Sequence, residues 1–133
     1  MTQLEQITQY MQTALASDNS GHSADHIDRV VALANKILIN EPMADPFIVR
    51  AAALLHDVYD DKLFNNASDV QLAKSHLKTF LSNISVSQDD ISRIFYIIDN
   101  MSWSKGIGGQ AQHLDINGQI VQDADRLEAV GAI

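Results

Sequence analysis

Apolar residues recur at helical spacing along almost the whole chain, and turn-forming residues separate these stretches. Because side chains three and four positions apart share one face of a helix, this spacing predicts about six helices. The first is expected to run to about Ala16 behind a capping box of Thr2 and Glu5. The second follows the turn-forming segment 17–21 and extends to Leu38. No alternating stretch is long enough to indicate a strand, so the pattern predicts an all-α fold with short connections.

The third predicted helix is almost wholly apolar and ends in two polar side chains. Asp45 and Pro46 supply a capping residue and a first-turn proline, and the helix is expected to end near His56 and Asp57. A helix of this composition belongs in the core, where polar groups need partners. His56 and Asp57 are therefore either satisfied core groups or ligands of an ion.

Helices are also predicted in the second half of the chain. After a loop over residues 58–67, Ser68 is expected to cap the fourth helix and Ser87 the fifth. The glycine-rich segment 101–112 ends the fifth helix, and Asp115 caps the last one. The apolar side of the last helix is expected to contain Ile116, Ile120, Ala124, Leu127 and Val130.

Length and composition bound the kinds of site that the chain can form. Its 133 residues are expected to form a single domain, large enough to bury roughly two thirds of the surface of the unfolded chain. Without cysteine, a metal site must use imidazole, carboxylate and water. The net charge of -8 argues against a broad surface for long nucleic acid. Residues 1–6 do not resemble a signal peptide and no apolar run reaches membrane-spanning length, so we expect no membrane association and a cytoplasmic protein.

Side chains suited to a divalent ion lie in separate segments of the chain. Ions held by nitrogen and oxygen need imidazoles and carboxylates that converge from different elements and leave positions for water and substrate. The segments that offer them are Gly21-His22-Ser23-Ala24-Asp25-His26-Ile27-Asp28-Arg29-Val30, Leu54-Leu55-His56-Asp57 and Gln119-Ile120-Val121-Gln122-Asp123-Ala124-Asp125-Arg126-Leu127-Glu128. Together they resemble the HD-domain superfamily of metal-dependent phosphohydrolases, in which a His precedes a His-Asp pair and a distant Asp follows.

Within that superfamily the chain resembles the small bacterial HD hydrolases active on nucleotides. This narrower similarity is carried by His22, by Asp60 and Lys62 after the His-Asp pair, and by residues 122–133. It implies a helical bundle around one divalent ion, Mn²⁺ or Mg²⁺, and hydrolysis of a phosphate ester or anhydride of a nucleotide. Because the family usually continues beyond Ile133, the single HD domain over residues 1–133 is expected to be shortened at its C-terminal end relative to the family.

Carried over residue by residue, the resemblance implies that His26, His56, Asp57 and Asp125 are the metal ligands. The spacing of the last helix instead favours Asp123, which lies nearer its apolar stripe. The Ala-Asp-Arg pattern of the family selects Asp125. We choose Asp125, because a ligand faces the site and need not face the centre of the core.

Hydrolysis also needs a group that orients the water and groups that bind the phosphate. Asp60 is predicted to orient or deprotonate the water, with Asp61 as its alternative, although both could simply lie in a solvated loop. The phosphate charge needs cationic or hydrogen-bonding partners. The side chains available for this role are His22, Arg29, Lys62 and Lys105.

Other functions compete with nucleotide hydrolysis. A single histidine is more often a core or surface residue than a ligand, and His76 and His113 are interpreted in that way. The main alternative is a non-catalytic module that binds metal and nucleotide. A di-iron oxygenase of the HD type would need further histidine ligands, of which His22 is the one near the site. The sequence leaves the native ion, the substrate and the oligomeric state open.

Overall fold

The regular secondary structure of the described residues is helix, joined by turns and short loops. The computed structural model describes residues 1–16, 23–60, 63–101 and 113–131. These residues form the helices α1 (Gln3–Leu15), α2 (Ser23–Leu38), α3 (Pro46–Leu55), α4 (Ala67–Asn83), α5 (Gln88–Asn100) and α7 (Ile116–Gly131). None of the described helices has both the length and the apolar content that crossing a membrane requires. The predicted all-α fold is confirmed.

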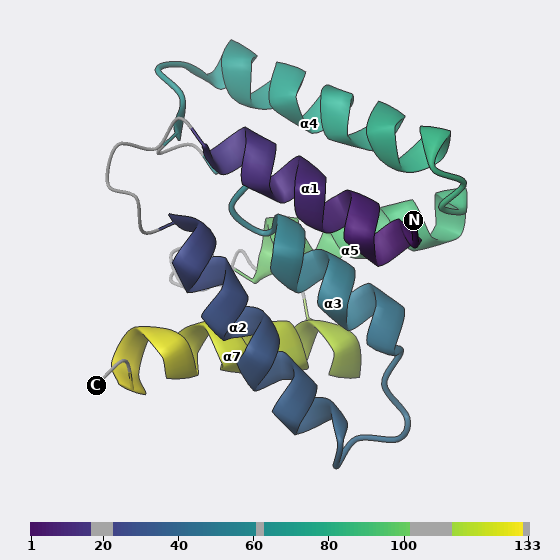
Figure 1. Cartoon of the computed structure of the whole chain (residues 1–133), viewed down its shortest axis with the longest axis vertical. Helices are drawn as coiled ribbons and strands as arrows, with labels where there is room; N and C mark the ends of the chain where they lie inside the picture. Colours follow the sequence, from purple (N-terminus) through teal and green to yellow (C-terminus); the bar gives the residue numbers. More distant parts are fainter. Residues whose placement is uncertain (17–22, 61–62, 102–112, 132–133) are drawn as a thin grey trace.

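Helix α3 is the central element of the bundle. Helices α1, α2, α5 and α7 pack around it (Figure 1), and seven of its ten residues are buried. Its alanines at positions 51–53 have small side chains, which allow neighbouring helices to approach closely. Helix α4 lies on the outside of the bundle beside α1, where the rings of Tyr10 and Phe80 stack with centroids 4.4 Å apart. The His-Asp pair therefore follows the most enclosed helix.

Most helices begin where the sequence predicted. The predicted capping side chains of Thr2, Asp45, Ser87 and Asp115 each accept a hydrogen bond from a backbone N–H of the following turn. The prediction for α4 is wrong, because Asn66 rather than Ser68 is its cap. Asn66 has an extended backbone and its Oδ1 accepts from the N–H of Asp69 at 2.9 Å, which leaves Ser68 inside the first turn. Asn and Ser cap helices equally well, so the earlier of the two residues starts the helix.

The buried side of α7 differs from the predicted one. Leu127 and Val130 are 52% and 85% exposed, whereas Val121 and Glu128 are buried. The helix is thus rotated about its axis relative to the predicted stripe. This rotation turns Glu128 toward α2, where it contacts His26 and Arg29.

A polar network anchors the loop that follows α3. The hydroxyl of Tyr59 donates to Asp99 Oδ1 on α5 at 2.7 Å, and the ring of Tyr59 stacks on Phe95 with centroids 5.7 Å apart. Lys74 on α4 donates to Asp99 Oδ2 at 2.6 Å and lies 5.5 Å from the centre of the Tyr59 ring. Two helices therefore hold the loop that begins at the His-Asp pair.

Candidate metal centre

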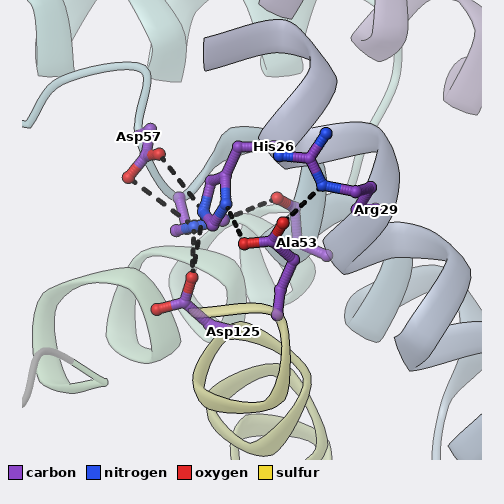
Figure 2. A network of polar contacts seen from close by, with 7 residues as sticks. His26, Arg29, Ala53, Asp57 and Asp125 are labelled. Atoms are coloured by element: carbon purple, nitrogen blue, oxygen red, sulfur yellow. Dashed lines mark hydrogen bonds and ion pairs between the residues drawn. The ribbon is translucent and has the colours of Figure 1, made fainter. Parts of the chain in front are cut away.

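The four predicted ligands lie together, although they come from three parts of the sequence. His26 is in the first turn of α2, His56 ends α3 and is followed by Asp57, and Asp125 is on α7 (Figure 2). Asp125 Oδ1 lies 3.1 Å from His26 Nε2 and 3.3 Å from His56 Nε2. Ligand atoms of His26, His56 and Asp57 lie within 4.8 Å of one another. The structure thus makes a compact group of two imidazoles and two carboxylates.

His56 presents a buried nitrogen to this group. Its Nδ1 lies 2.7 Å from the backbone oxygen of Ala53, so this nitrogen carries the proton and donates it. Its Nε2 is left as an acceptor, and no described residue provides a hydrogen bond to it. The His56 side chain is only 5% exposed. A buried acceptor without a donor is costly, and a cation beside it would remove that cost.

His26 is held by a carboxylate that the sequence analysis did not single out. Its Nδ1 lies 2.8 Å from Glu128 Oε2, and Arg29 donates through Nε to the other oxygen of Glu128. Glu128 is 7% exposed. Its only signal in the sequence is its position three residues after Asp125, which places both on one side of a helix.

The carboxylates change the proton affinities of both imidazoles. The hydrogen bond to Asp125 raises the pKa of His26 to about 9 against the opposing effect of burial, and Glu128 adds to the rise. Burial lowers the pKa of His56, but Asp125 and Asp57 outweigh it and keep this pKa above its ordinary value. Burial would raise the pKa of Asp125, yet the two imidazoles hold it far below its usual range. The group therefore favours a positive charge between its carboxylates, which a proton or a metal ion can supply.

The donor set fits a divalent ion. Neutral imidazole and carboxylate suit first-row divalent metals and Mg²⁺, and the cluster contains no thiolate that would select a softer ion. Both imidazoles donate their second nitrogen to an acceptor outside the group, as metal-binding histidines do. His56 Nε2 has no hydrogen-bond donor among the described residues and faces the acceptor Asp125 Oδ1 at 3.3 Å, so a cation between the two atoms would satisfy both.

Three further residues that the sequence suggested for the site differ in exposure and in their contacts. Asp60 is half-buried and closes a turn with Asp57, since its backbone N–H donates to the Asp57 carbonyl at 3.3 Å. Asp123 is exposed, and residues two positions apart on a helix do not share a face, so it does not lie beside Asp125. The side chain of Arg29 is 55% exposed and pairs with Glu128, a structural role that the sequence analysis did not assign.

Several predictions fall on residues that the structure does not describe. His22, Asp61, Lys62 and Lys105 lie outside the described residues, as does the glycine-rich segment 102–112. Their predicted roles stay predictions. His76 and His113 are both exposed and do not belong to the group.

Comparisons with known proteins identify similar chains over nearly the whole length. The family model described as HD domain matches residues 23–130. The uncharacterized protein YpgQ of Bacillus subtilis strain 168 is 39% identical over 133 residues, which are 100% of this chain and 63% of YpgQ. The uncharacterized protein L803 of Acanthamoeba polyphaga mimivirus is 34% identical over 125 residues, which cover 86% of this chain and 50% of L803. The chain thus spans less than two thirds of the length of either relative.

Two solved structures have a similar fold over nearly the whole of this chain. A Lactobacillus plantarum protein superposes with a TM-score of 0.80 at 41% identity, over 97% of this chain and 58% of the other. The crystal structure of Bacillus subtilis YpgQ in complex with ADP superposes with a TM-score of 0.71 at 36% identity, over 96% of this chain and 58% of YpgQ.

Proposed function

Because the chain belongs to the HD domain family, we propose that it is a metal-dependent phosphohydrolase that cleaves a phosphate ester or anhydride bond of a nucleotide. The observation that carries this proposal is the convergence of His26, Asp57 and Asp125 around the buried Nε2 of His56, which has no hydrogen-bond donor among the described residues. The complex of YpgQ with ADP supports a nucleoside phosphate as the substrate. Nucleoside triphosphates and their deoxy forms are the first compounds to test.

These four residues are proposed to hold one divalent ion, Mn²⁺ or Mg²⁺. When bound, such an ion polarises a phosphoryl oxygen and lowers the pKa of a bound water. The imidazoles would hold it through Nε2, since their Nδ1 atoms are already engaged by Ala53 and Glu128. Asp57 and Asp125 supply negative charge that keeps the cation in the site.

The neighbouring residues are proposed to handle the water and the phosphate. Asp60 lies three residues after Asp57, and its backbone N–H donates to the Asp57 carbonyl, which keeps it close to the proposed ion site. Its carboxylate is proposed to accept a proton from the attacking water. Asp61 is the neighbouring alternative. A chain with a net charge of -8 needs local positive charge to attract an anionic substrate. The ion supplies part of that charge, and the remaining partners are proposed to be His22, Arg29, Lys62 and Lys105.

The test is hydrolysis of a panel of nucleoside and deoxynucleoside mono-, di- and triphosphates, with phosphate and pyrophosphate both assayed. We expect turnover with Mn²⁺ or Mg²⁺ and none after treatment with a chelator. Inactivity of the metal-loaded protein against every compound would remove the proposal. Tight nucleotide binding without turnover would instead favour a non-catalytic metal- and nucleotide-binding module.

Helix α7 offers a matched pair of variants for the ligand assignment. Asp125→Ala removes a carboxylate that lies beside both imidazoles, so we expect metal affinity to fall by roughly 100-fold or more and activity to be lost. Asp123→Ala removes an exposed carboxylate two residues earlier and should change neither. Isothermal titration with Mn²⁺ measures the affinities. Metal binding that survives Asp125→Ala would remove Asp125 from the ligand set.

A further inference from the structure

Helix α7 buries a carboxylate that the proposed hydrolysis does not use. Glu128 is 7% exposed and lies on the same buried face as Ile120, Val121 and Ala124. A buried carboxylate is costly unless charged or hydrogen-bonding partners compensate it. Glu128 has both kinds of partner, since Oε2 lies 2.8 Å from His26 Nδ1 and Oε1 accepts from Arg29 Nε.

We propose that Glu128 is a positioning residue of the metal centre, which holds His26 in the tautomer and ring orientation that turn its Nε2 toward Asp57 and Asp125. This role rests on the metal site proposed above. Glu128 does not bind the ion itself, because it contacts the Nδ1 edge of the ring while the carboxylates of the site face Nε2. It acts through His26.

The positions of Glu128 and Asp125 on α7 explain how the His26 ring is oriented. Glu128 and Asp125 are three residues apart on one helix, and they contact opposite nitrogens of the same imidazole at 2.8 and 3.1 Å. A carboxylate accepts a proton and does not donate one, so Glu128 fixes the proton of neutral His26 on Nδ1. The lone pair of Nε2 is then directed into the site. Without Glu128, either nitrogen could carry the proton and the ring could turn over.

Arg29 completes the arrangement from the neighbouring turn of α2. It follows His26 by three residues, and its guanidinium holds the second oxygen of Glu128. Two donors therefore meet one carboxylate, since Glu128 accepts from Arg29 with one oxygen and from His26 with the other. His56 is oriented differently, by the uncharged carbonyl of Ala53. Of the two imidazoles, only His26 is therefore expected to respond to a change at Glu128.

The test compares two substitutions of nearly the same size. Glu128→Gln keeps an oxygen that accepts the His26 proton. Glu128→Leu places an apolar side chain on the buried face, removes the acceptor and leaves Arg29 without its ion-pair partner, a loss softened because Arg29 is 55% exposed. We expect Glu128→Leu to weaken Mn²⁺ binding by roughly 10- to 100-fold, and Glu128→Gln to recover most of that loss. Asp123→Ala is the control on the same helix.

Nitrogen-15 NMR of the histidine rings in the Zn²⁺-loaded protein provides a readout that does not depend on activity. In the wild type we expect a slowly exchanging Nδ1–H for both His26 and His56. In Glu128→Leu the His26 proton should exchange rapidly or move to the other nitrogen, while the His56 signal stays unchanged. A change confined to His26 would follow from loss of the acceptor that this ring alone contacts.

The outcomes separate this role from the proposed function. If the wild type binds no divalent ion, the metal site itself is wrong. If the wild type binds Mn²⁺ and Glu128→Leu binds it equally well, or if its His26 Nδ1–H is unaltered, Glu128 is not a positioning residue. If Glu128→Leu does not fold, Glu128→Ala is tested instead, once circular dichroism has shown that it folds. Its Mn²⁺ affinity and its histidine NMR signals then decide the role of Glu128. If neither variant folds, Glu128 is needed for the fold itself and the proposed role is rejected.

Discussion

In each histidine of the cluster, one ring nitrogen donates a hydrogen bond and the other faces the proposed ion site. His56 donates to the Ala53 carbonyl and His26 to Glu128. The second nitrogen of each ring then faces an oxygen of Asp125 at 3.1 to 3.3 Å. Two facing lone pairs repel each other, so the arrangement is stable only when a positive charge lies between them. In the metal-free protein that charge is a proton, and metal binding must release it.

This proton makes the stability of the metal-free protein depend on pH. The pKa of His26 rises from 6.5 to about 9 on folding. A raised pKa in the folded state stabilises the protein fully below pH 6.5, and this contribution is lost as pH increases to about 9. The raised pKa of His56 acts in the same direction. We therefore expect the melting temperature of chelator-treated protein to fall between these two pH values.

Thermal melts followed by circular dichroism at closely spaced pH values measure this effect. Saturating Mn²⁺ should reverse the trend over the same interval, because the ion competes with fewer protons as pH rises. His26→Gln removes one titrating group and should flatten the metal-free profile. A melting temperature that does not change across the interval in the wild type would contradict the expected protonation.

For single residues, the sequence predicts which side chains suit a metal site better than it predicts which residues contact one another. The resemblance to the HD family selected Asp125, and the structure places that side chain beside both imidazoles, although its role as a ligand remains a proposal. Apolar spacing alone favoured Asp123, which is exposed. Glu128 was not predicted, because which polar residue a helix turns inward depends on the elements that surround the helix. Leu127 remains exposed for the same reason.

Helix starts were more predictable than helix ends, because a cap is a local interaction. The end of α4 illustrates the difference. The N–H of Val86 donates to the Leu81 carbonyl at 3.1 Å and the N–H of Ser85 to the Ser82 carbonyl at 3.0 Å, with Ser85 at a φ of 71°. This hydrogen-bond pattern usually has glycine at the left-handed position. Serine gives no such signal in the sequence, so the type of ending could not be predicted.

Between elements, the Tyr59 network is expected to stabilise the loop that follows the His-Asp pair. Burial and the bond to Asp99 raise the pKa of Tyr59, which keeps its hydroxyl protonated as a donor. Tyr59→Phe removes that donor but leaves the ring, and Asp99 keeps its ion pair with Lys74. We expect the free energy of unfolding to fall by about 1.5 kcal/mol, the lower end of the range for a hydrogen bond to a charged group, because this bond is only partly buried. Urea denaturation measures it.

Tyr96→Phe is the matched control for this change. The Tyr96 hydroxyl also donates a hydrogen bond, to the His113 carbonyl at 3.0 Å, but the residue is 42% exposed. Its loss should alter the free energy of unfolding by less than about 0.5 kcal/mol. If Tyr59→Phe costs no more than Tyr96→Phe, the network does not hold the loop.

In the whole molecule, the apolar pattern determines the architecture and the polar residues determine its function. Helical spacing was sufficient to predict the all-α class and the buried α3, because burying a continuous apolar helix requires others around it. The same pattern could not predict that α7 lies against α2, since many arrangements of helices bury similar area. That contact, which creates the cluster, became predictable only through the resemblance to a family.

An ion in the cluster would join three elements that are distant in sequence. His26 is on α2, His56 and Asp57 follow α3, and Asp125 is on α7, so one bound cation cross-links these segments. Local opening of any of them would then require loss of a ligand, which slows hydrogen exchange in all of them together. Helix α4 contributes none of the proposed ligands and lies on the outside of the bundle (Figure 1). It serves as an internal control.

Hydrogen–deuterium exchange with and without Mn²⁺ tests this coupling. We expect slower exchange in peptides that cover residues 23–30, 54–60 and 120–128, and unchanged exchange in α4. The same experiment on Asp125→Ala should show no protection at a Mn²⁺ concentration that saturates the wild type, because one ligand of the set is missing. Protection confined to a single segment would mean that the ion does not bridge the helices, and equal protection of α4 would indicate general stabilisation instead of a local cross-link.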